Sequence, residues 1–274
     1  MTIEELIIYG KKYIHSIDAK MLLANLLNYD TLELLTHLDE IVPEEKVKIY
    51  KDEIEAFKRN IPLQYIIGNT NFFGYEFIVN KNVLIPRFET EELVDNTIKW
   101  IENNHKDKQL KVVDLGCGSG IIGITLKKKL PYLDVTCLDI SKEALEVTKE
   151  NKEKLNADIK IIWGDMLENN NEYYDIIISN PPYISKDEKI EDIVRENEPH
   201  LALYAEEEGT YFYRKILESI AKREEKPYLV AFEIGYLQKE KVTMLAKEIL
   251  KDVSVECKKD LAGKDRMIFI EIKR

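Results

Sequence analysis

The chain has few cysteines and histidines, and neither residue type is arranged for metal binding or catalysis. The three cysteines are far apart in the sequence and form no CxxC pair. This spacing favours neither a structural zinc site nor a disulfide framework. The four histidines, His15, His37, His105 and His200, lie outside the motifs described below. We therefore predict no metal site and no catalytic histidine.

Long apolar runs and an excess of positive charge are also missing. No apolar stretch approaches the roughly 18 residues needed to cross a bilayer, and the first residues, MTIEELIIYGKKY, are too acidic and interrupted for a signal or transit peptide. With 40 Lys and Arg against 51 Asp and Glu, the net charge of −11 disfavours contact with nucleic-acid phosphates. We expect a cytosolic (cytoplasmic) protein with no membrane contact and no direct nucleic-acid partner.

The length and patterning of the chain indicate several parts. A chain of 274 residues with 45% apolar residues allows one large domain and a smaller module. Apolar residues recur at helical spacing from residue 2 to about 60, which predicts an N-terminal helical bundle over 1–61. Residues 62–85 are rich in β-formers separated by Gly and Asn, and they are interpreted as a β-hairpin linker. Residues 86–274 form the last part, whose first helix is expected to be capped by Thr90.

The C-terminal part alternates short apolar runs with helical patterns. This alternation is typical of βαβ units and predicts an α/β fold with a mainly parallel sheet covered by helices on both faces. Strands are expected near residues 111–115, 134–139, 159–162, 174–179, 228–233, 253–256 and 267–272.

A glycine-rich turn follows the first of these strands, in the segment VVDLGCGSG. Glycines let a ligand approach the backbone closely, and the start of the next helix presents free N–H groups. The residues expected to contact a cofactor here are Gly116, Cys117, Gly118, Ser119 and Gly120. A GxGxxG pattern is also met by Gly118, Gly120 and Gly123, so a nicotinamide or flavin site remains an alternative at this point.

Acidic residues at the ends of the next two strands indicate an adenosyl ligand. Asp139, about 20 residues after the glycines, is placed to accept hydrogen bonds from both ribose hydroxyls, with Ile140 beside it. After the third strand, Asp165 could accept from an adenine amino group while Met166 packs against the ring.

The tetrapeptide Asn180-Pro181-Pro182-Tyr183 follows a buried strand and carries the most specific chemistry. Its prolines stiffen the turn and set the direction of its carbonyls. If the Asn180 side-chain oxygen and the Pro181 carbonyl each accept an N–H, a planar NH₂ group is held with its lone pair free, and Tyr183 can stack on it. Such positioning suits attack on a sulfonium methyl group without a metal or a strong base. This favours S-adenosylmethionine (SAM)-dependent methyl transfer over a dehydrogenase.

These motifs together resemble the class I SAM-dependent methyltransferases that act on amide or exocyclic amino nitrogens. Further segments are similar to the HemK/PrmC family of peptide chain release factor glutamine N5-methyltransferases, over nearly the whole chain. They are PLQYIIG from residue 62, FFG from 72, VLIPRFETE from 83, EPHLAL from 198, and Asp265-Arg266. Phe88 departs from the family pattern, which usually has proline at that position.

The resemblance implies a Rossmann-like, seven-stranded sheet whose last strand is antiparallel. It implies that SAM is the cofactor, S-adenosylhomocysteine the product, and the glutamine of the Gly-Gly-Gln loop of class 1 release factors the methyl acceptor. The residues 180–183 and Arg87 are the expected substrate-binding residues, with Asn180 also near the cofactor. Asn180, Pro181 and Tyr183 are the expected catalytic residues of this protein methylation, which belongs to translation termination.

Two other functions remain open from the residues themselves. DNA adenine (N6) and ribosomal RNA guanine (N2) methyltransferases also use Asn-Pro-Pro-Tyr, although the acidic charge argues against them. The chain could instead be a non-catalytic nucleotide-binding module that docks on a partner through its helical bundle.

Overall fold

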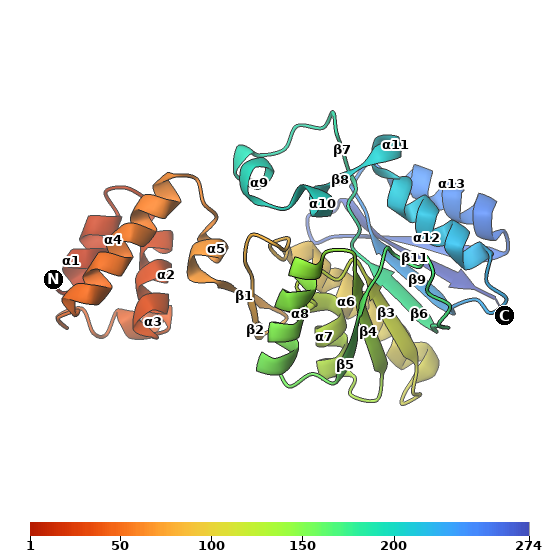
Figure 1. Cartoon of the computed structure of the whole chain (residues 1–274), viewed down its shortest axis with the longest axis horizontal. Helices are drawn as coiled ribbons and strands as arrows, with labels where there is room; N and C mark the ends of the chain where they lie inside the picture. Colours follow the sequence, from red (N-terminus) through yellow and green to blue (C-terminus); the bar gives the residue numbers. More distant parts are fainter. Residues whose placement is uncertain (274) are drawn as a thin grey trace. The chain divides into compact units, whose positions relative to one another are not determined.

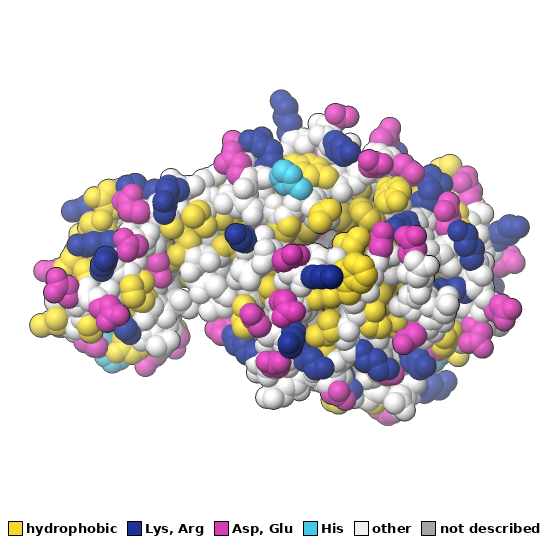
Figure 2. All heavy atoms as spheres, viewed as in Figure 1, with side chains coloured by type: hydrophobic (Ala, Val, Ile, Leu, Met, Phe, Trp, Pro, Cys, Tyr) yellow, Lys and Arg dark blue, Asp and Glu magenta, His cyan; other side chains and the backbone are white. Residues whose placement is uncertain are grey.

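The computed structural model describes residues 1–273, which form two compact units (Figure 1). The first comprises Met1–Asn69 together with Glu191–Asn197, and the second comprises Thr70–Ile190 and Glu198–Arg274. No described helix is long and apolar enough to cross a membrane. Acidic and basic side chains are mixed over the visible face of each unit (Figure 2).

The first unit is a small helical bundle, as the helical spacing predicted. Its helices are α1 (Ile3–Gly10), α2 (Ser16–Leu27), α3 (Thr31–Leu34), α4 (Glu44–Lys58), α5 (Leu63–Ile67) and α9 (Asp192–Asn197). A capping box begins α1, in which Thr2 accepts from the Glu5 N–H and the Glu5 carboxylate accepts from the Thr2 N–H. The buried Tyr50 hydroxyl donates to the Ala19 carbonyl at 3.1 Å and so ties α4 to α2.

The predicted hairpin is correct for only part of residues 62–85. Strands β1 (Asn69–Phe72) and β2 (Tyr75–Ile78) form a two-stranded sheet through a turn at Phe73 and Gly74, which both have positive φ. Residues 63–67 are helical instead of extended, so that part of the prediction is wrong. Pro62 precedes this short helix and Gly68, with φ of +81°, ends it, and these two flanking residues outweigh the β-forming side chains between them.

The second unit is built on a seven-stranded sheet with the order β10-β11-β9-β6-β3-β4-β5. Every strand expected from the sequence is present. The antiparallel partners of β11 are β9 and β10, while β9, β6, β3, β4 and β5 pair in parallel, as the family resemblance implied. The strands are β3 (Lys111–Leu115), β4 (Asp134–Asp139), β5 (Ile159–Trp163), β6 (Ile176–Ser179), β9 (Leu229–Glu233), β10 (Val253–Lys259) and β11 (Asp265–Ile272).

Two apolar layers cover the faces of this sheet because alternate side chains of each strand point to opposite sides. Val112 and Ile176 belong to the layer under α6, α7 and α8, whereas Val113 and Ile177 belong to the layer under α12 and α13. Figure 1 shows these two sets of helices on either side of the strands. The helices are α6 (Phe88–His105), α7 (Ile121–Lys129), α8 (Lys142–Lys154), α12 (Tyr211–Ala221) and α13 (Lys239–Leu250).

The strand order reverses beside β3, and this reversal positions the site. The chain runs from β3 outward to β4 and β5, then returns to β6 on the other side of β3. Loops at the carboxyl ends of β3 and β6 therefore diverge and leave a crevice, where open α/β sheets bind ligands. Smaller elements lie near this edge: β7 (Ile184–Ser185), α10 (His200–Leu203), β8 (Tyr204–Ala205) and α11 (Glu206–Gly209).

The first helix of this unit begins earlier than expected, and the prediction that Thr90 caps it is wrong. Helix α6 starts at Phe88 with Arg87 as its N-cap, and the Thr90 N–H bonds the Arg87 carbonyl at 3.1 Å. Thr90 therefore lies inside the first turn, and its hydroxyl is free to bond elsewhere.

Candidate active site

A cavity of about 290 Å³ opens at the carboxyl ends of the central strands, within the second unit. It brings together residues that are more than 90 positions apart in the sequence. Of the predicted site residues, those that line it are Arg87, Gly116, Cys117, Gly118, Ser119, Asp139, Ile140, Asp165, Met166, Asn180 and Pro182. Gly120, Pro181 and Tyr183 are not among the lining residues of this cavity.

The glycine turn leaves open space above its backbone. Gly116 and Gly118 have φ of +68° and +57°, a region that other residues rarely adopt. A Cβ atom added to Gly118 would meet nothing within 4 Å, and one added to Gly116 would meet only Met166 Cε, at 3.7 Å. Glycine here therefore keeps a surface free for a ligand that approaches the main chain.

Gly120 and Gly123 have a different role, because both are packed against neighbouring elements. A Cβ on Gly120 would lie 2.8 Å from Thr148 Cγ2, and one on Gly123 would lie 2.4 Å from Cys137 Sγ. The Gly123 N–H also donates to the buried Asp114 carboxylate at 3.0 Å. Two of the three glycines in the GxGxxG pattern thus hold α7 close to its neighbours.

Asp139 is held rigidly at the edge of the cavity. Its Oδ2 accepts from the Gly118 N–H and its Oδ1 from the Ser141 N–H, both at 2.8 Å. Burial raises the pKa of Asp139, and these N–H donors oppose that rise. Each carboxylate oxygen has a second lone pair, so the group can still accept from a ligand hydroxyl.

Asp165 has a cationic partner that the sequence did not reveal. Lys215 Nζ, on α12, lies 2.6 Å from Asp165 Oδ2 and 3.2 Å from Glu168 Oε2. Lys215 also lines the cavity. Because 50 residues separate the pair, no local sequence pattern indicates this contact.

Arg87 is paired with a buried carboxylate. Its Nη2 lies 2.6 Å from Glu198 Oε1, and Glu198 Oε2 accepts from the Ile85 N–H at 3.0 Å. The Glu198 side chain is only 2% exposed. The segments PRFET and EPHLAL, which the family resemblance singled out separately, therefore meet at one side of the cavity.

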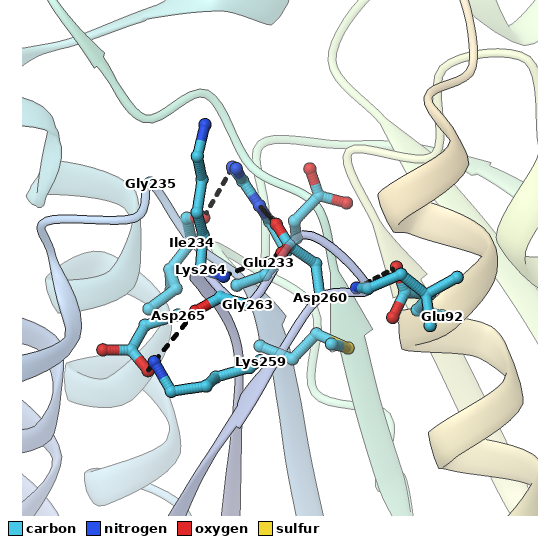
Figure 3. A network of polar contacts seen from close by, with 12 residues as sticks. Glu92, Glu233, Ile234, Gly235, Lys259, Asp260, Gly263, Lys264 and Asp265 are labelled. Carbon is cyan, nitrogen blue, oxygen red and sulfur yellow. Dashed lines mark hydrogen bonds and ion pairs between the residues drawn. The ribbon is translucent and has the colours of Figure 1, made fainter.

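Asn180 is linked to two buried residues that sequence reasoning missed. Its Nδ2 donates to Thr90 Oγ1 at 3.2 Å, and Thr90 Oγ1 donates to Glu233 Oε2 at 2.6 Å. Tyr183 points its hydroxyl at the same carboxylate, 3.4 Å from Oε1. Burial raises the pKa of Glu233 to about 7. Glu233 lies at the end of β9, beside the β10–β11 turn (Figure 3).

The groups that line the cavity suit the chemistry of an adenosyl sulfonium ligand. The open surface over Gly116 and Gly118 admits a ligand close to the backbone, and Asp139 offers a carboxylate for ribose hydroxyls. Ile140 and Met166 also line the cavity and provide apolar contact. Among residues 1–273, no group of three or more His, Cys, Asp or Glu is placed to hold a metal ion.

Comparison with solved structures shows the fold of the second unit. The chain aligns with a methyltransferase from Pyrococcus furiosus over 73% of its length and 89% of that chain, with a TM-score of 0.53 and 17% identity. It also aligns with the hMettl16 catalytic domain, solved with the MAT2A 3'UTR hairpin 6, over 84% and 83% of the two chains, with a TM-score of 0.57 and 13% identity. Both results confirm the class I methyltransferase fold.

Sequence comparison is more specific. Residues 90–203 match the methyltransferase small domain, and residues 14–68 match the PrmC N-terminal domain. Release factor glutamine methyltransferases from Bacillus cereus and Bacillus subtilis are 38% and 42% identical over 92% and 89% of this chain, and over 91% and 88% of theirs. The one from Clostridium botulinum is 40% identical, with 93% and 91% covered. The chain therefore belongs to the HemK/PrmC family of release factor glutamine methyltransferases, which are class I SAM-dependent enzymes.

Proposed function

We propose that this enzyme transfers a methyl group from SAM to the side-chain amide nitrogen (N5) of the glutamine in the Gly-Gly-Gln loop of class 1 release factors. The observation that carries the proposal is that Asn180 lines the same cavity as the open glycine turn. Family membership supplies the acceptor, since the relatives are release factor glutamine methyltransferases.

The cofactor end of the cavity would hold SAM through the chain's own donors and acceptors. Asp139 would accept from the ribose hydroxyls, and the backbone over residues 116–119 would lie against the amino-acid portion. Ile140 and Met166 would pack on the adenine ring, with Asp165 near its amino group. Bound SAM supplies a methyl group on positively charged sulfur.

The substrate end would hold the glutamine amide by its two hydrogens. The Asn180 side-chain oxygen and the Pro181 carbonyl would each accept one N–H, which leaves the nitrogen lone pair directed at the methyl carbon. Pro181 is buried and the turn is stiff, so these acceptors keep their direction. The N–C bond forms as the S–C bond breaks, and one proton leaves the nitrogen for water.

Positioning of this kind supplies most of the rate enhancement that such a reaction needs. An amide nitrogen is a poor nucleophile, and alignment of two reactants can contribute about 7–11 kcal/mol. The reaction needs no strong base because the amide proton becomes acidic as the new N–C bond forms.

Intact mass spectrometry tests the proposal directly. Incubation of a class 1 release factor with SAM and the enzyme should add a single methyl group. The same release factor with its loop glutamine replaced by alanine should gain none. Equal labelling of both proteins would contradict the proposed acceptor.

A nucleic-acid acceptor is less well supported. The Asn-Pro-Pro-Tyr turn is compatible with a flipped base, but the chain carries a net charge of −11. Methyl transfer to adenine or guanine in RNA or DNA, at a rate comparable with that on the release factor, would favour this alternative.

A further inference from the structure

Thr90, Glu233 and Asn180 form a hydrogen-bond chain that the proposed function does not use. Thr90 Oγ1 lies 2.6 Å from Glu233 Oε2 and 3.2 Å from Asn180 Nδ2. Thr90 and Glu233 are each 1% exposed, so these contacts are shielded from bulk water. Asn180 is the member of the chain that is more exposed, and it lines the cavity together with Thr90.

The chemistry of the three groups sets the direction of the chain. An ionised carboxylate only accepts hydrogen bonds, and a hydroxyl has a single hydrogen to donate. Thr90 must therefore donate to Glu233, and one of the two lone pairs on its oxygen accepts from the Asn180 NH₂. The Asn180 Oδ1 then points away from Thr90. Within residues 1–273 no hydrogen bond involves this oxygen. Because Asn180 lines the cavity, we infer that its oxygen is available to a group bound there.

We propose that Glu233, acting through Thr90, is a positioning residue that orients the Asn180 carboxamide with its oxygen toward the NH₂ group of the methyl acceptor. This inference rests on the proposed function, because an amide NH₂ acceptor requires an oxygen at that point. Neither Glu233 nor Tyr183, which also contacts Glu233, lines the cavity. The role of Glu233 is therefore indirect.

Protonation of Glu233 would reverse the chain. The neutral carboxyl would donate to Thr90 Oγ1, and Thr90 would then donate to Asn180 Oδ1. In that arrangement the Asn180 carboxamide is flipped, so that its oxygen and nitrogen exchange positions and its NH₂ group is presented to the cavity. The NH₂ groups of Asn180 and of the methyl-accepting amide are both donors, and two donors cannot form a hydrogen bond with each other. The methyl-accepting amide would therefore lose its hydrogen bond to Asn180. The protonation of Glu233 would thus determine whether the substrate meets the oxygen or the NH₂ group of the Asn180 side chain.

Several charged and titratable groups face Glu233 from the elements packed around it. Burial raises its pKa to about 7, Glu89 on α6 adds to the rise, and the Thr90 hydroxyl, Arg266 on β11 and the Tyr183 hydroxyl oppose it. Tyr213 on α12 donates to the Glu233 backbone carbonyl at 2.8 Å. Glu233 should therefore change protonation near neutral pH.

The β10–β11 turn holds the opposing positive charge in place. Arg266 Nε lies 3.2 Å from Asp260 Oδ2, and Arg266 Nη1 donates to the Ile234 carbonyl at 3.3 Å. Asp260 is itself held by the Lys264 N–H at 2.9 Å. Figure 3 shows this turn beside the Glu233 end of β9. The ionised form of Glu233 thus has a fixed cation to stabilise it.

Turnover of three threonine variants on the release factor separates orientation from packing. Thr90→Val keeps the shape but removes the hydroxyl, and we expect kcat to fall at least about tenfold, as for the loss of a hydrogen bond near the top of the usual range. Thr90→Ser should restore most of kcat. The control Thr97→Val removes a buried hydroxyl of the same helix that donates to the Leu93 carbonyl, and it should leave kcat unchanged. Equal rates for wild type and Thr90→Val would overturn the inference.

The pH profile tests Glu233 itself. Since the ionised form gives the productive orientation, wild-type kcat should rise as pH increases through about 7. Glu233→Gln has no ionisable group at this position and should lack this limb. If kcat of Glu233→Gln still rises with pH and has the same midpoint, the pH dependence belongs to another group and the inference is contradicted.

An NMR titration of the full chain gives an answer that does not depend on the acceptor. With ¹⁵N-labelled asparagine, the side-chain NH₂ signal of Asn180 can be identified by its absence in Asn180→Asp. This signal should shift with a midpoint near pH 7 in the wild type and not in Thr90→Val or Glu233→Gln. If the chemical shift of this signal does not change with pH in the wild type, the inference is refuted. If instead the titration holds and no methyl reaches the release factor, only the proposed acceptor is wrong.

Discussion

At the residue scale, buried carboxylates distinguish this site from an ordinary strand-end loop. Asp114 is fully buried, and one of its oxygens, Oδ1, has no hydrogen-bond partner among the residues that the structure describes. Burial raises its pKa to about 7, and the Gly123 N–H only partly offsets that effect. A group whose pKa is raised on folding binds a proton more tightly in the native state than in the unfolded state.

The Asp114 carboxyl should make stability depend on pH. Below about pH 4 both states are protonated, and between about 4 and 7 only the native state keeps the proton, so the free energy of unfolding falls as pH rises. Relative to Asp114→Asn, the wild type should lose about 1.4 kcal/mol per pH unit across this window. Urea unfolding of both proteins at pH 4.5, 6 and 8 measures the difference. A difference that does not change with pH would contradict the assigned burial effect.

The Asn180 side chain should matter for turnover far more than for cofactor binding. Asn180→Ala removes one of the two acceptors proposed for the substrate amide, and we expect kcat to fall about 100-fold. SAM affinity, measured by calorimetry, should weaken only modestly. Asn104→Ala, on the exposed part of α6, is a matched control that should change neither quantity. Normal turnover in Asn180→Ala would refute the role assigned to this residue.

At the element scale, the close approach of α7 to β4 shapes the cofactor end of the cavity. Gly123 lies in the first turn of α7, and Cys137 and Val135 of β4 lie directly beneath it. Helix α7 starts where the glycine turn ends, so any displacement of the helix would also move that turn.

Gly123→Ala should therefore destabilise the protein although alanine is the better helix former. The new Cβ would lie 2.4 Å from Cys137 Sγ and 3.3 Å from Val135 Cγ1, and such overpacking costs about 1–3 kcal/mol. Gly164→Ala is the control, because its Cβ would meet only Leu138 atoms at 3.6 Å or more. Thermal unfolding followed by circular dichroism should show a lower midpoint for Gly123→Ala alone. Equal midpoints for the two variants would contradict this packing argument.

At the scale of the whole molecule, the first unit is made of two segments that are separate in the sequence, so no single boundary divides the chain into the two units. Residues 191–197 belong with the N-terminal helices, and Asn197 Nδ2 donates to the Asn60 carbonyl at 2.8 Å. Every residue that lines the cavity, in contrast, belongs to the second unit.

Removal of residues 1–69 should accordingly leave SAM binding intact. Because all the lining residues remain in the truncated chain, the dissociation constant should change by no more than a factor of about two, within the usual limit of additivity of about 0.5 kcal/mol. Calorimetry on the truncated chain measures this, after far-UV circular dichroism has verified that it is folded. A folded truncated chain that no longer binds SAM would show that the first unit contributes to the cofactor site.

Local patterns in the sequence were enough for the strands, the fold class and the short motifs around the cavity. Seven apolar runs correspond to the seven strands of the central sheet. In the parallel strands β3, β6 and β9, burial on both faces leaves near-continuous Val, Ile and Leu. The glycine turn, Asp139 and Asn180 could be identified because each lies at the carboxyl end of a strand. Residues 63–67 were misjudged because the Pro and Gly that flank them outweighed the β-forming side chains.

Only the tertiary structure decided which distant side chains support those motifs. Thr90 and Glu233 are 143 residues apart, Arg87 and Glu198 are 111 apart, and Asp165 and Lys215 are 50 apart. The pairing of a carboxylate with a hydroxyl or a cation produces no repeating pattern in the sequence, because strand order and helix packing determine which side chain lies beside it. The sequence by itself determined the short motifs at the strand ends, which supply many of the groups around the crevice. The packing of α6, β9 and α12 determined how those groups are oriented and charged.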